Sequence, residues 1–373
     1  MKRNNLKILI IAPACANNQS GFALRVFQWI QMIKDHAQVT YLCTYQEENP
    51  NIAHQFYYQM FPDNWKSKIK KLWTYYKTDF SGLRLNEKPD IVQIHTPYFF
   101  GLKKFFPNTP VVLVEHDVNW NLLKYDMSAG PGLGKLPFQF PLVPWMQWRA
   151  KKYEKDILNE AKHTFVCSSV DRNEIIKELP HLKQKISVVP NCLDVTNYTP
   201  SEKKGDYVLF MGSLTYSANR DAAKIICEEL APRLPEIPFR ILGSGTYAKE
   251  HPKNVQFLGH VKEIKSYLEY CRLFIVPLRF GSGTRWKILE ALAVQRPVLS
   301  TPKGAEGLEV THGENIWLEE NWDSFVSAIK EFWGNSEKAK GIAQNGRKLV
   351  ERKYDYKIYT PEVMNIYQSL LAS

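Results

Sequence analysis

The 373-residue sequence lacks several features that would place it in a specialised class of proteins. It has no window of ~18 consecutive apolar residues, so no segment is predicted to span a membrane. Its six cysteines are scattered without a CxxC pair, which predicts neither a zinc site nor a disulfide framework and favours the reducing cytoplasm. It also shows no internal repeat, no low-complexity tract, no cluster of metal ligands and no hydrolase-like pair of carboxylates.

The composition that is present suits an ordinary globular protein with an uneven basic charge. Hydrophobic residues make up 44% of the chain, and its length is enough for two domains. The formal net charge is +11. Residues 1–190 hold 25 Lys and Arg against 16 Asp and Glu, whereas residues 191–373 hold 24 against 22. The first half is therefore predicted to meet something anionic: a membrane surface, a phosphorylated acceptor or nucleic acid.

The amino-terminal part reads as strand, loop, helix and strand. Residues 1–16 resemble a signal peptide, but the apolar run at residues 8–12 is short and Pro13 follows it, which favours a buried strand at residues 6–12. Gly21 opens a helix with apolar helical spacing, and residues 39–44 form the next strand. This order predicts a doubly wound parallel sheet with ligands at the carboxyl ends of its strands. Gly21 would then border a cleft, although a plain helix start explains it equally well.

Two histidines lie at the carboxyl ends of the strands predicted at residues 90–95 and 111–115. His95 ends the first of these strands, and His116 comes directly after the second. Because carboxyl ends of parallel strands share one edge of a sheet, both side chains are expected where ligands bind. A structural role for either histidine stays open.

The most informative segment lies at residues 273–308. A short apolar strand leads into the turn Gly-Ser-Gly-Thr at residues 281–284, which feeds a helix. Free N–H groups and the helix dipole make such a turn an anion site. Arg285 and Lys287 place positive charge where the dipole favours acids, and a missing anion is the simplest explanation. Gly283, Lys287 and Glu290 share one helical face, suited to phosphates and sugar hydroxyls, although surface charges on an ordinary turn are the alternative.

The run GSGTRWKILEALAVQRPVLSTPKGAEGL resembles the donor-site segment of family 4 glycosyltransferases, in their GxGTRxKxLEA subgroup. The resemblance implies that the carboxylate of Glu290 binds the ribose hydroxyls of a nucleotide sugar. It also implies that Gly283 and Thr284 face the diphosphate. Ser282 stands where the family often has a first glutamate, so the donor-sugar contacts of that glutamate do not carry over.

Other segments extend the resemblance. VVLVEHDVNW implies that His116 lies beside the donor sugar. His95, which this segment does not include, is a candidate for the acceptor side. VVPNCLD resembles the PNGVD element that leads into the second domain. Gly212 lies at the first turn of that domain and Val261 at the base-binding position. Ser213 replaces an arginine that clamps the diphosphate in many relatives, which transfers that task to Arg285 and Lys287, with Arg220 as a less certain helper.

The family resemblance implies the α/β fold called GT-B: two Rossmann-like domains facing each other across a cleft. We expect residues 1–195 to form the acceptor-binding domain and residues 196–354 the donor domain. Residues 355–373 are expected to form a helix that packs back on the first domain.

The expected activity is retaining transfer of a sugar from a nucleotide donor to an acceptor hydroxyl. The helix dipole, Arg285 and Lys287 can stabilise the departing diphosphate, so neither a metal nor another cofactor is expected. Two alternatives are a nucleotide-sugar epimerase on the same fold and a catalytically silent binding module at a membrane surface. Nucleic-acid binding is disfavoured because no nucleic-acid motif is present.

Residues 65–77, WKSKIKKLWTYYK, place an aromatic and aliphatic stripe beside five lysines. A basic amphipathic helix of this kind suits an anionic bilayer, although a helix docked on the sheet with a solvated lysine face is the alternative. We therefore expect a peripheral protein on the cytoplasmic face of the membrane. Its acceptor would be a lipid-linked or saccharide intermediate of envelope polysaccharide synthesis.

Overall fold

The chain folds into two compact units. The computed structural model describes residues 6–12, 21–43, 54–57, 87–118, 120, 142–201, 203, 205–247, 250–261, 263–281 and 285–372. Unit 1 comprises Met1–Lys124, Leu136–Asn191 and Tyr359–Ser373, and unit 2 comprises Tyr125–Lys135 and Cys192–Ile358. Each unit is built on its own sheet.

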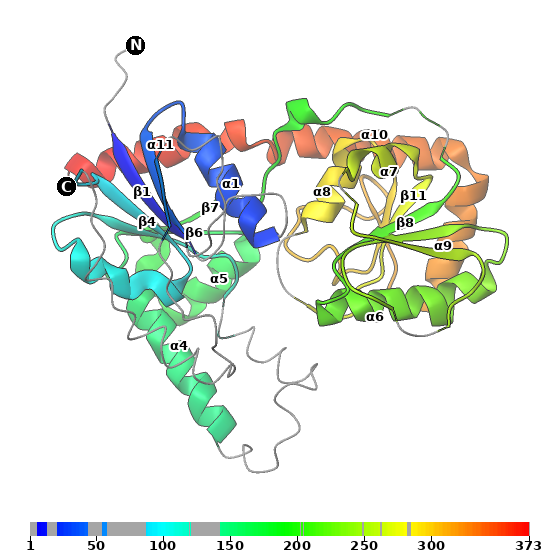
Figure 1. Ribbon diagram of the computed structural model, residues 1–373, viewed down its shortest axis with the longest axis horizontal. Coiled ribbons are helices and arrows are strands. Elements are labelled where there is room, and N and C mark those ends of the chain that lie inside the picture. Colours follow the sequence, from blue (N-terminus) through cyan, green and yellow to red (C-terminus); the bar gives the residue numbers. More distant parts are fainter. Residues whose placement is uncertain are drawn as a thin grey trace. The chain divides into compact units, whose positions relative to one another are not determined.

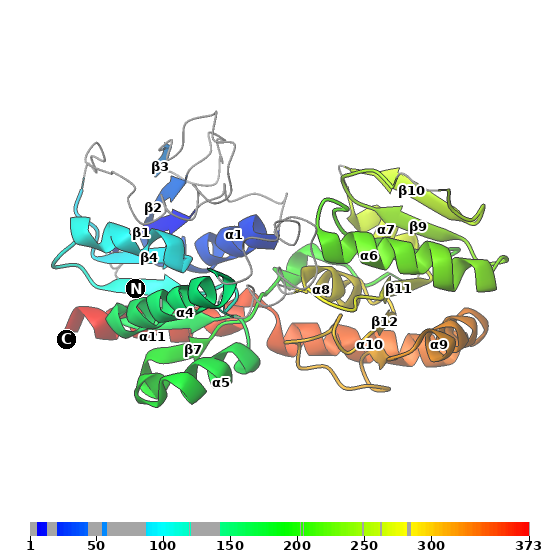
Figure 2. The same cartoon turned by 90° about the horizontal axis from the view of Figure 1, so that it is seen from below.

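Unit 1 contains a seven-stranded sheet whose paired strands are all parallel, in the order β3-β2-β1-β4-β5-β6-β7. Figure 2 shows β3, β2, β1 and β4 side by side in this order. The central strands are almost continuously apolar and buried, as helices on both faces require. The strands are β1 (Lys7–Ala12), β2 (Gln38–Cys43), β3 (His54–Tyr57), β4 (Ile91–His95), β5 (Val111–Val114), β6 (His163–Val166) and β7 (Ile186–Val188).

The helices of unit 1 include one from the far end of the chain. This helix, α11 (Tyr356–Ala372), buries Val363 and Tyr367, and Thr360 Oγ1 donates to the carbonyl of Met32, 3.4 Å away. The predicted return of the C-terminal helix to the first unit is therefore confirmed. The other helices are α1 (Gly21–Ile33), α4 (Leu142–Glu160), α5 (Ser169–Glu178) and the 3-10 helices η1 (Pro97–Phe105) and η3 (Pro180–Lys185).

Unit 2 contains a six-stranded parallel sheet in the order β10-β9-β8-β11-β12-β13. Figure 1 shows α6 on one face of this sheet and α7 and α8 on the other. The strands are β8 (Val208–Met211), β9 (Phe239–Leu242), β10 (Val255–Gly259), β11 (Leu273–Val276), β12 (Val298–Ser300) and β13 (Trp317–Leu318). The helices are α6 (Ser217–Ile225) with its continuations Ile226–Leu230 and Ala231–Arg233, α7 (Lys265–Tyr270), α8 (Trp286–Ala293), α9 (Trp322–Gly334) and α10 (Ser336–Lys353), and η4 (Val195–Asn197) precedes them.

In each sheet the order of the strands reverses at one pair of neighbouring strands. A ligand is expected to bind at this pair. In unit 1, β1 pairs with β2 on one side and β4 on the other. In unit 2, β8 pairs with β9 on one side and β11 on the other. Loops that leave such neighbouring strands diverge and open a crevice at their carboxyl ends. Gly21 follows β1 and His95 ends β4, whereas Gly212 and Gly281 follow β8 and β11.

The two doubly wound sheets confirm the predicted α/β class. Within the described part of the chain, no helix is long and apolar enough to cross a membrane. The predicted amphipathic segment at residues 65–77 lies outside the described residues, as does most of the Gly/Pro-rich segment at residues 128–145.

Candidate functional site

Glu290 lies on α8 and is held by a residue of the segment that enters unit 2. The hydroxyl of Tyr198 donates to Glu290 Oε1 at 3.1 Å, and Lys265 Nζ lies 5.0 Å from the centroid of the Tyr198 ring. Burial raises the pKa of the Glu290 carboxyl to about 7. Burial also raises the pKa of the Tyr198 hydroxyl, which keeps it a hydrogen-bond donor. The carboxyl is thus oriented before any ligand arrives.

Lys287 is one helical turn before Glu290, and its ammonium also has a prepared partner. Lys287 Nζ donates to Asn219 Oδ1 at 2.8 Å and lies 4.8 Å from the centroid of the Phe210 ring. Burial, with the charge of Arg285 nearby, lowers the pKa of Lys287 to about 7. A neutral amide is its hydrogen-bond partner, so an anion beside the ammonium would meet an uncompensated charge.

Gly212 makes the contact between Lys287 and Asn219 possible. A Cβ atom added at Gly212 would come within 2.5 Å of Asn219 Cγ, so a larger residue would displace this amide. The Nδ2 atom of Asn219 donates to the carbonyl of Ser213 at 3.0 Å, which leaves Oδ1 for the ammonium. The predicted site residue Gly212 therefore contributes indirectly, because its lack of a side chain leaves room for that of Asn219.

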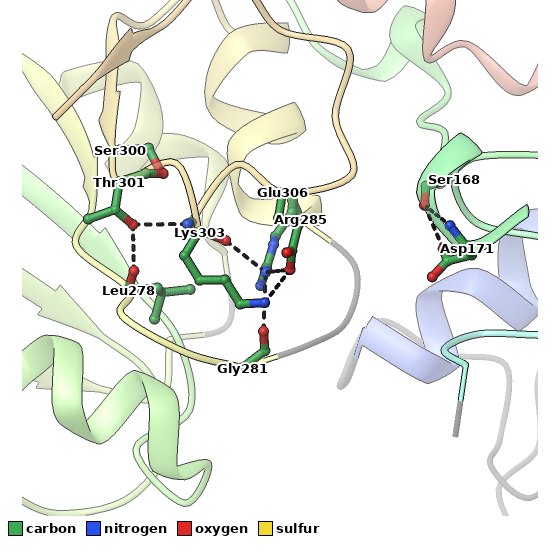
Figure 3. A network of polar contacts seen from close by, with 10 residues as sticks. Ser168, Asp171, Leu278, Gly281, Arg285, Ser300, Thr301, Lys303 and Glu306 are labelled. Atoms are coloured by element: carbon green, nitrogen blue, oxygen red, sulfur yellow. Dashed lines mark hydrogen bonds and ion pairs between the residues drawn. The ribbon is translucent and has the colours of Figure 1, made fainter. Parts of the chain in front are cut away.

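Arg285 braces the loops that flank α8. Its side chain is only 6% exposed, and Nη2 donates to the carbonyls of Lys303, at 2.9 Å, and Gly281, at 3.4 Å. Glu306 Oε2 lies 3.7 Å from the same nitrogen and also pairs with Lys303. Figure 3 shows the guanidinium among these partners. The structure thus gives Arg285 a bracing role, and its predicted contact with a diphosphate stays a prediction.

The two histidines of unit 1 are in direct contact. His95 Nδ1 and His116 Nε2 are 3.0 Å apart. Phe22, next to Gly21 at the start of α1, stacks on the His116 ring with centroids 4.0 Å apart and planes inclined by 13°. The structure therefore brings Gly21, His95 and His116 to one edge of the sheet, as the strand-end argument predicted.

The remaining predicted residues are placed less completely. Val261 lies half-buried in the loop after β10. Arg220 donates to the carbonyls of Leu214, at 3.0 Å, and Thr215, at 3.2 Å. The predicted Ser282, Gly283 and Thr284 lie outside the described residues. Among the described residues, no group of three or more His, Cys, Asp or Glu could hold a metal ion.

Asn219 and Tyr198 are site residues that the sequence did not predict. Asn219 lies in the first turn of α6, after the glycine turn at Gly212, and that position was the one available signal. Tyr198 follows the Pro-Asn-Cys-Leu-Asp element, where nothing in the local pattern indicates a contact with a residue 92 positions later.

The two halves of the chain match two family models. Residues 30–197 match the model described as Glycosyltransferase Family 4, and residues 205–335 match that described as Glycosyl transferases group 1. The boundary between the matches falls near the boundary between the units.

Curated relatives are distant. The chain is 22% identical over 302 residues to 2-deoxystreptamine N-acetyl-D-glucosaminyltransferase of Niallia circulans, an alignment that covers 76% of this chain and 70% of that protein. It is 29% identical over 194 residues to an Escherichia coli protein named UDP-Gal:alpha-D-GlcNAc-diphosphoundecaprenol alpha-1,3-galactosyltransferase, covering 44% of this chain and 49% of that one.

Solved structures share the fold along the whole chain. The Anabaena protein Alr3699/HepE, in complex with UDP and glucose, superposes with a TM-score of 0.72 at 14% identity and covers 98% of this chain and 100% of its own. Sucrose-phosphate synthase from Thermosynechococcus elongatus also has a TM-score of 0.72, at 13% identity, with 99% and 100% covered. At these identities the likeness concerns the fold.

Proposed function

Because the chain is a family 4 glycosyltransferase with the GT-B fold, we propose that it transfers a sugar with retention from a nucleoside diphosphate sugar to an acceptor hydroxyl. The observation that supports this reaction best is the pair Lys287 and Glu290 on one face of α8. Each is part-buried and already held by a neutral partner, Asn219 and Tyr198 respectively.

The two side chains suit the two polar parts of a nucleoside diphosphate. The Glu290 carboxylate accepts hydrogen bonds from two vicinal ribose hydroxyls, with Tyr198 fixing its orientation. The Lys287 ammonium faces the diphosphate, whose charge would raise the pKa of Lys287 from about 7 and keep it protonated. The amino end of α8 adds its dipole at the same point.

The chemical step requires stabilisation of the negative charge that grows on the departing diphosphate. Lys287 and the helix dipole provide it in a partly dehydrated site, where such interactions are stronger than in water. Arg285 keeps the glycine turn and the loop after β12 in register through the carbonyls of Gly281 and Lys303. The acceptor hydroxyl attacks from the face that the diphosphate leaves, and a donor phosphate oxygen takes its proton. No step requires a metal ion or another cofactor.

The acceptor is proposed to be a lipid-linked or saccharide intermediate of envelope polysaccharide synthesis. Two observations support this proposal: the lipid-diphosphate substrate in the name of the Escherichia coli relative, and the basic charge concentrated in residues 1–190. We propose accordingly that the protein works in the cytoplasm at the inner face of the membrane, which residues 65–77 would contact.

Thermal-shift measurements with UDP-, GDP-, ADP- and TDP-sugars test the donor site. We expect the nucleotide sugars with one particular base to raise the melting temperature, because a ligand that binds the folded state stabilises it by mass action. With that donor and an acceptor extract, nucleotide should be released only when acceptor is present, and EDTA should leave the rate unchanged. Release or isomerisation of the donor without acceptor would instead favour the epimerase, and loss of activity with EDTA would contradict metal-free transfer.

A further inference from the structure

Four buried side chains form a continuous line of hydrogen bonds across unit 1. Tyr367 of α11 donates its hydroxyl to Gln93 Oε1. Gln93 Nε2 lies 2.6 Å from His95 Nε2, and His95 Nδ1 lies 3.0 Å from His116 Nε2. The line thus joins the C-terminal helix to the carboxyl ends of β4 and β5, where His116 ends it.

The chemistry of these groups gives the line a direction. The amide nitrogen of Gln93 can only donate, so His95 Nε2 accepts from it. A neutral imidazole has one N–H group, which in His95 must then be on Nδ1. His95 Nδ1 donates to His116 Nε2, and the proton of His116 is left on Nδ1.

This direction of the hydrogen bonds holds when both rings are neutral, and their surroundings favour the neutral state. Burial lowers the pKa of His95 well below its usual value, and the Arg25 guanidinium lowers it further. Burial likewise lowers the pKa of His116, with His95 and Arg25 as further causes. Arg25 is fully buried, and its guanidinium donates to Val189 and Asn191.

Exposure along the line shows which member can meet a substrate. Gln93, His95 and Tyr367 are 0% exposed, whereas His116 is 8% exposed. Phe22 stacks on the His116 ring, and Cys167 Sγ donates to the His116 carbonyl at 3.1 Å, so both ring and backbone are held. Among the residues that the structure describes, the Nδ1 atom of His116 has no hydrogen-bond partner.

Backbone strain lies at the same place. Thr96, directly after His95, has a φ of 107°, a value that β-branched residues rarely adopt. Such a conformation is unfavourable and persists only where the surrounding structure imposes it. The end of β4 is therefore held in one arrangement against its local preference.

We propose that Tyr367, Gln93 and His95 are positioning residues that hold His116 in its Nδ1–H tautomer, so that His116 donates a hydrogen bond to a substrate oxygen. This inference rests on the proposed function and on the family resemblance, which implies that His116 lies beside the donor sugar. In this tautomer Nε2 is occupied by His95, so His116 has no nitrogen available to take a proton from the acceptor. His116 is then a donor and not the general base of the reaction.

The tautomers can be measured without activity. Long-range ¹H–¹⁵N correlation of the full chain, labelled with ¹⁵N-histidine, distinguishes Nδ1–H from Nε2–H rings, and His95→Gln and His116→Gln assign the signals. We expect both histidines to be neutral with the proton on Nδ1 at pH 7. A charged His116, or a proton on its Nε2, would overturn the proposal whatever the enzyme's substrate.

Gln93→Glu tests whether the line sets the tautomer. The introduced carboxylate still accepts from Tyr367, but it also accepts from His95 Nε2–H, which reverses every later bond. His116 should then have its proton on Nε2, and kcat/KM should fall about 10- to 100-fold, the effect of losing one hydrogen bond to the reacting substrate. Affinity for the nucleotide, assigned to unit 2, should stay within about two-fold.

Thr360→Val is the matched control, because it removes another buried hydroxyl of α11, which donates to the carbonyl of Met32. It should change neither the tautomers nor kcat/KM. An unchanged His116 tautomer in Gln93→Glu, or a reversed tautomer with unchanged kcat/KM, would refute the positioning role. Absence of transfer with every donor would instead refute the proposed function, and the tautomer measurement would still stand.

Discussion

Burial shifts the pKa values of Lys287 and Glu290 in opposite directions, so that both groups titrate near the same pH. Burial lowers the pKa of the ammonium and raises that of the carboxyl, each to about 7. They are three positions apart on α8, yet each has its hydrogen bond to a different neutral residue. Without a ligand, Lys287 and Glu290 together carry little net charge. A bound ligand favours the charged form of each of the two groups.

Removal of the Glu290 carboxylate should weaken donor binding specifically. Glu290→Ala loses charge-assisted hydrogen bonds worth about 1.5–3 kcal/mol, so nucleotide affinity should fall roughly 10- to 150-fold. Isothermal titration calorimetry measures the affinity, and Glu337→Ala, an exposed carboxylate on α10, serves as the control. Equal affinities in Glu290→Ala and wild type would show that the donor site lies elsewhere.

The affinity for a nucleotide sugar should be bell-shaped in pH with its maximum near 7. Below pH 7 the Glu290 carboxyl must lose a proton to accept from ribose, which costs binding free energy. Above pH 7 the Lys287 amine must gain a proton to face the diphosphate, which has the same effect. Calorimetry from pH 5.5 to 8.5, in buffers of different ionisation enthalpy, measures both the affinity and the protons exchanged.

Two variants separate the limbs of this profile. Glu290→Gln should abolish the decline on the acidic side, whereas Lys287→Arg, which keeps its charge, should abolish the decline on the alkaline side. A profile that is flat from pH 5.5 to 8.5 in the wild type would contradict the assignment of these two groups to the ligand.

At the level of single elements, α8 ends in a defined capping motif. The N–H of Arg296 donates to the carbonyl of Ala291, at 2.9 Å, and that of Gln295 to Leu292, at 3.0 Å, which is the Schellman arrangement. Gln295 has a φ of 61°, in the left-handed region where glycine is usual. The helix that presents Lys287 and Glu290 therefore stops through a locally strained residue.

Gln295→Gly should relieve this strain and stabilise unit 2. A residue with a side chain pays about 1 kcal/mol in the left-handed region, so the melting temperature of unit 2 should rise by about 2–4 °C. Gln295→Ala keeps a Cβ atom and should give no such gain, which makes it the matched control. Calorimetric unfolding that finds the two variants equally stable would argue against backbone strain at this position.

At the level of the whole molecule, basic charge is distributed unequally along the chain. The excess of basic residues belongs to residues 1–190, and the lysine-rich segment at residues 65–77 lies within it, outside the described part of the chain. Each lysine near an anionic bilayer adds about 1 kcal/mol, screened beyond ~10 Å at 0.1 M salt. We therefore expect reversible binding to anionic vesicles that weakens with salt.

Co-sedimentation with anionic and neutral liposomes tests this expectation. Replacement of Lys66, Lys68, Lys70 and Lys71 by Glu should abolish pelleting with anionic vesicles and leave nucleotide binding unchanged. The control makes the same change of charge at four exposed lysines of unit 2, Lys253, Lys330, Lys340 and Lys348, and should affect pelleting much less. Equal pelleting of both variants would contradict membrane binding through residues 65–77 and would favour the alternative of a solvated lysine face.

Local sequence patterns predicted much of the architecture. Short apolar runs, a glycine turn and helical periodicity predicted the strands at residues 6–12, 39–44, 90–95 and 111–115 of unit 1 and the strand, turn and helix around residues 281–284 of unit 2, because burial on two faces requires these patterns. The same reasoning placed Lys287 and Glu290 on one face of α8 and His95 and His116 at neighbouring strand ends. These relations depend on helix geometry and strand direction, which a few adjacent residues specify.

The partners of those residues came from the tertiary structure. Asn219 is 68 positions from Lys287, Tyr198 is 92 from Glu290, and Tyr367 is 274 from Gln93. Such contacts depend on which strands are neighbours and on where a distant helix packs, and no spacing in the chain encodes that. Arg285 illustrates the difference. Its charge in the sequence suggested a contact with an anionic ligand. In the folded chain its guanidinium donates to the carbonyls of Gly281 and Lys303.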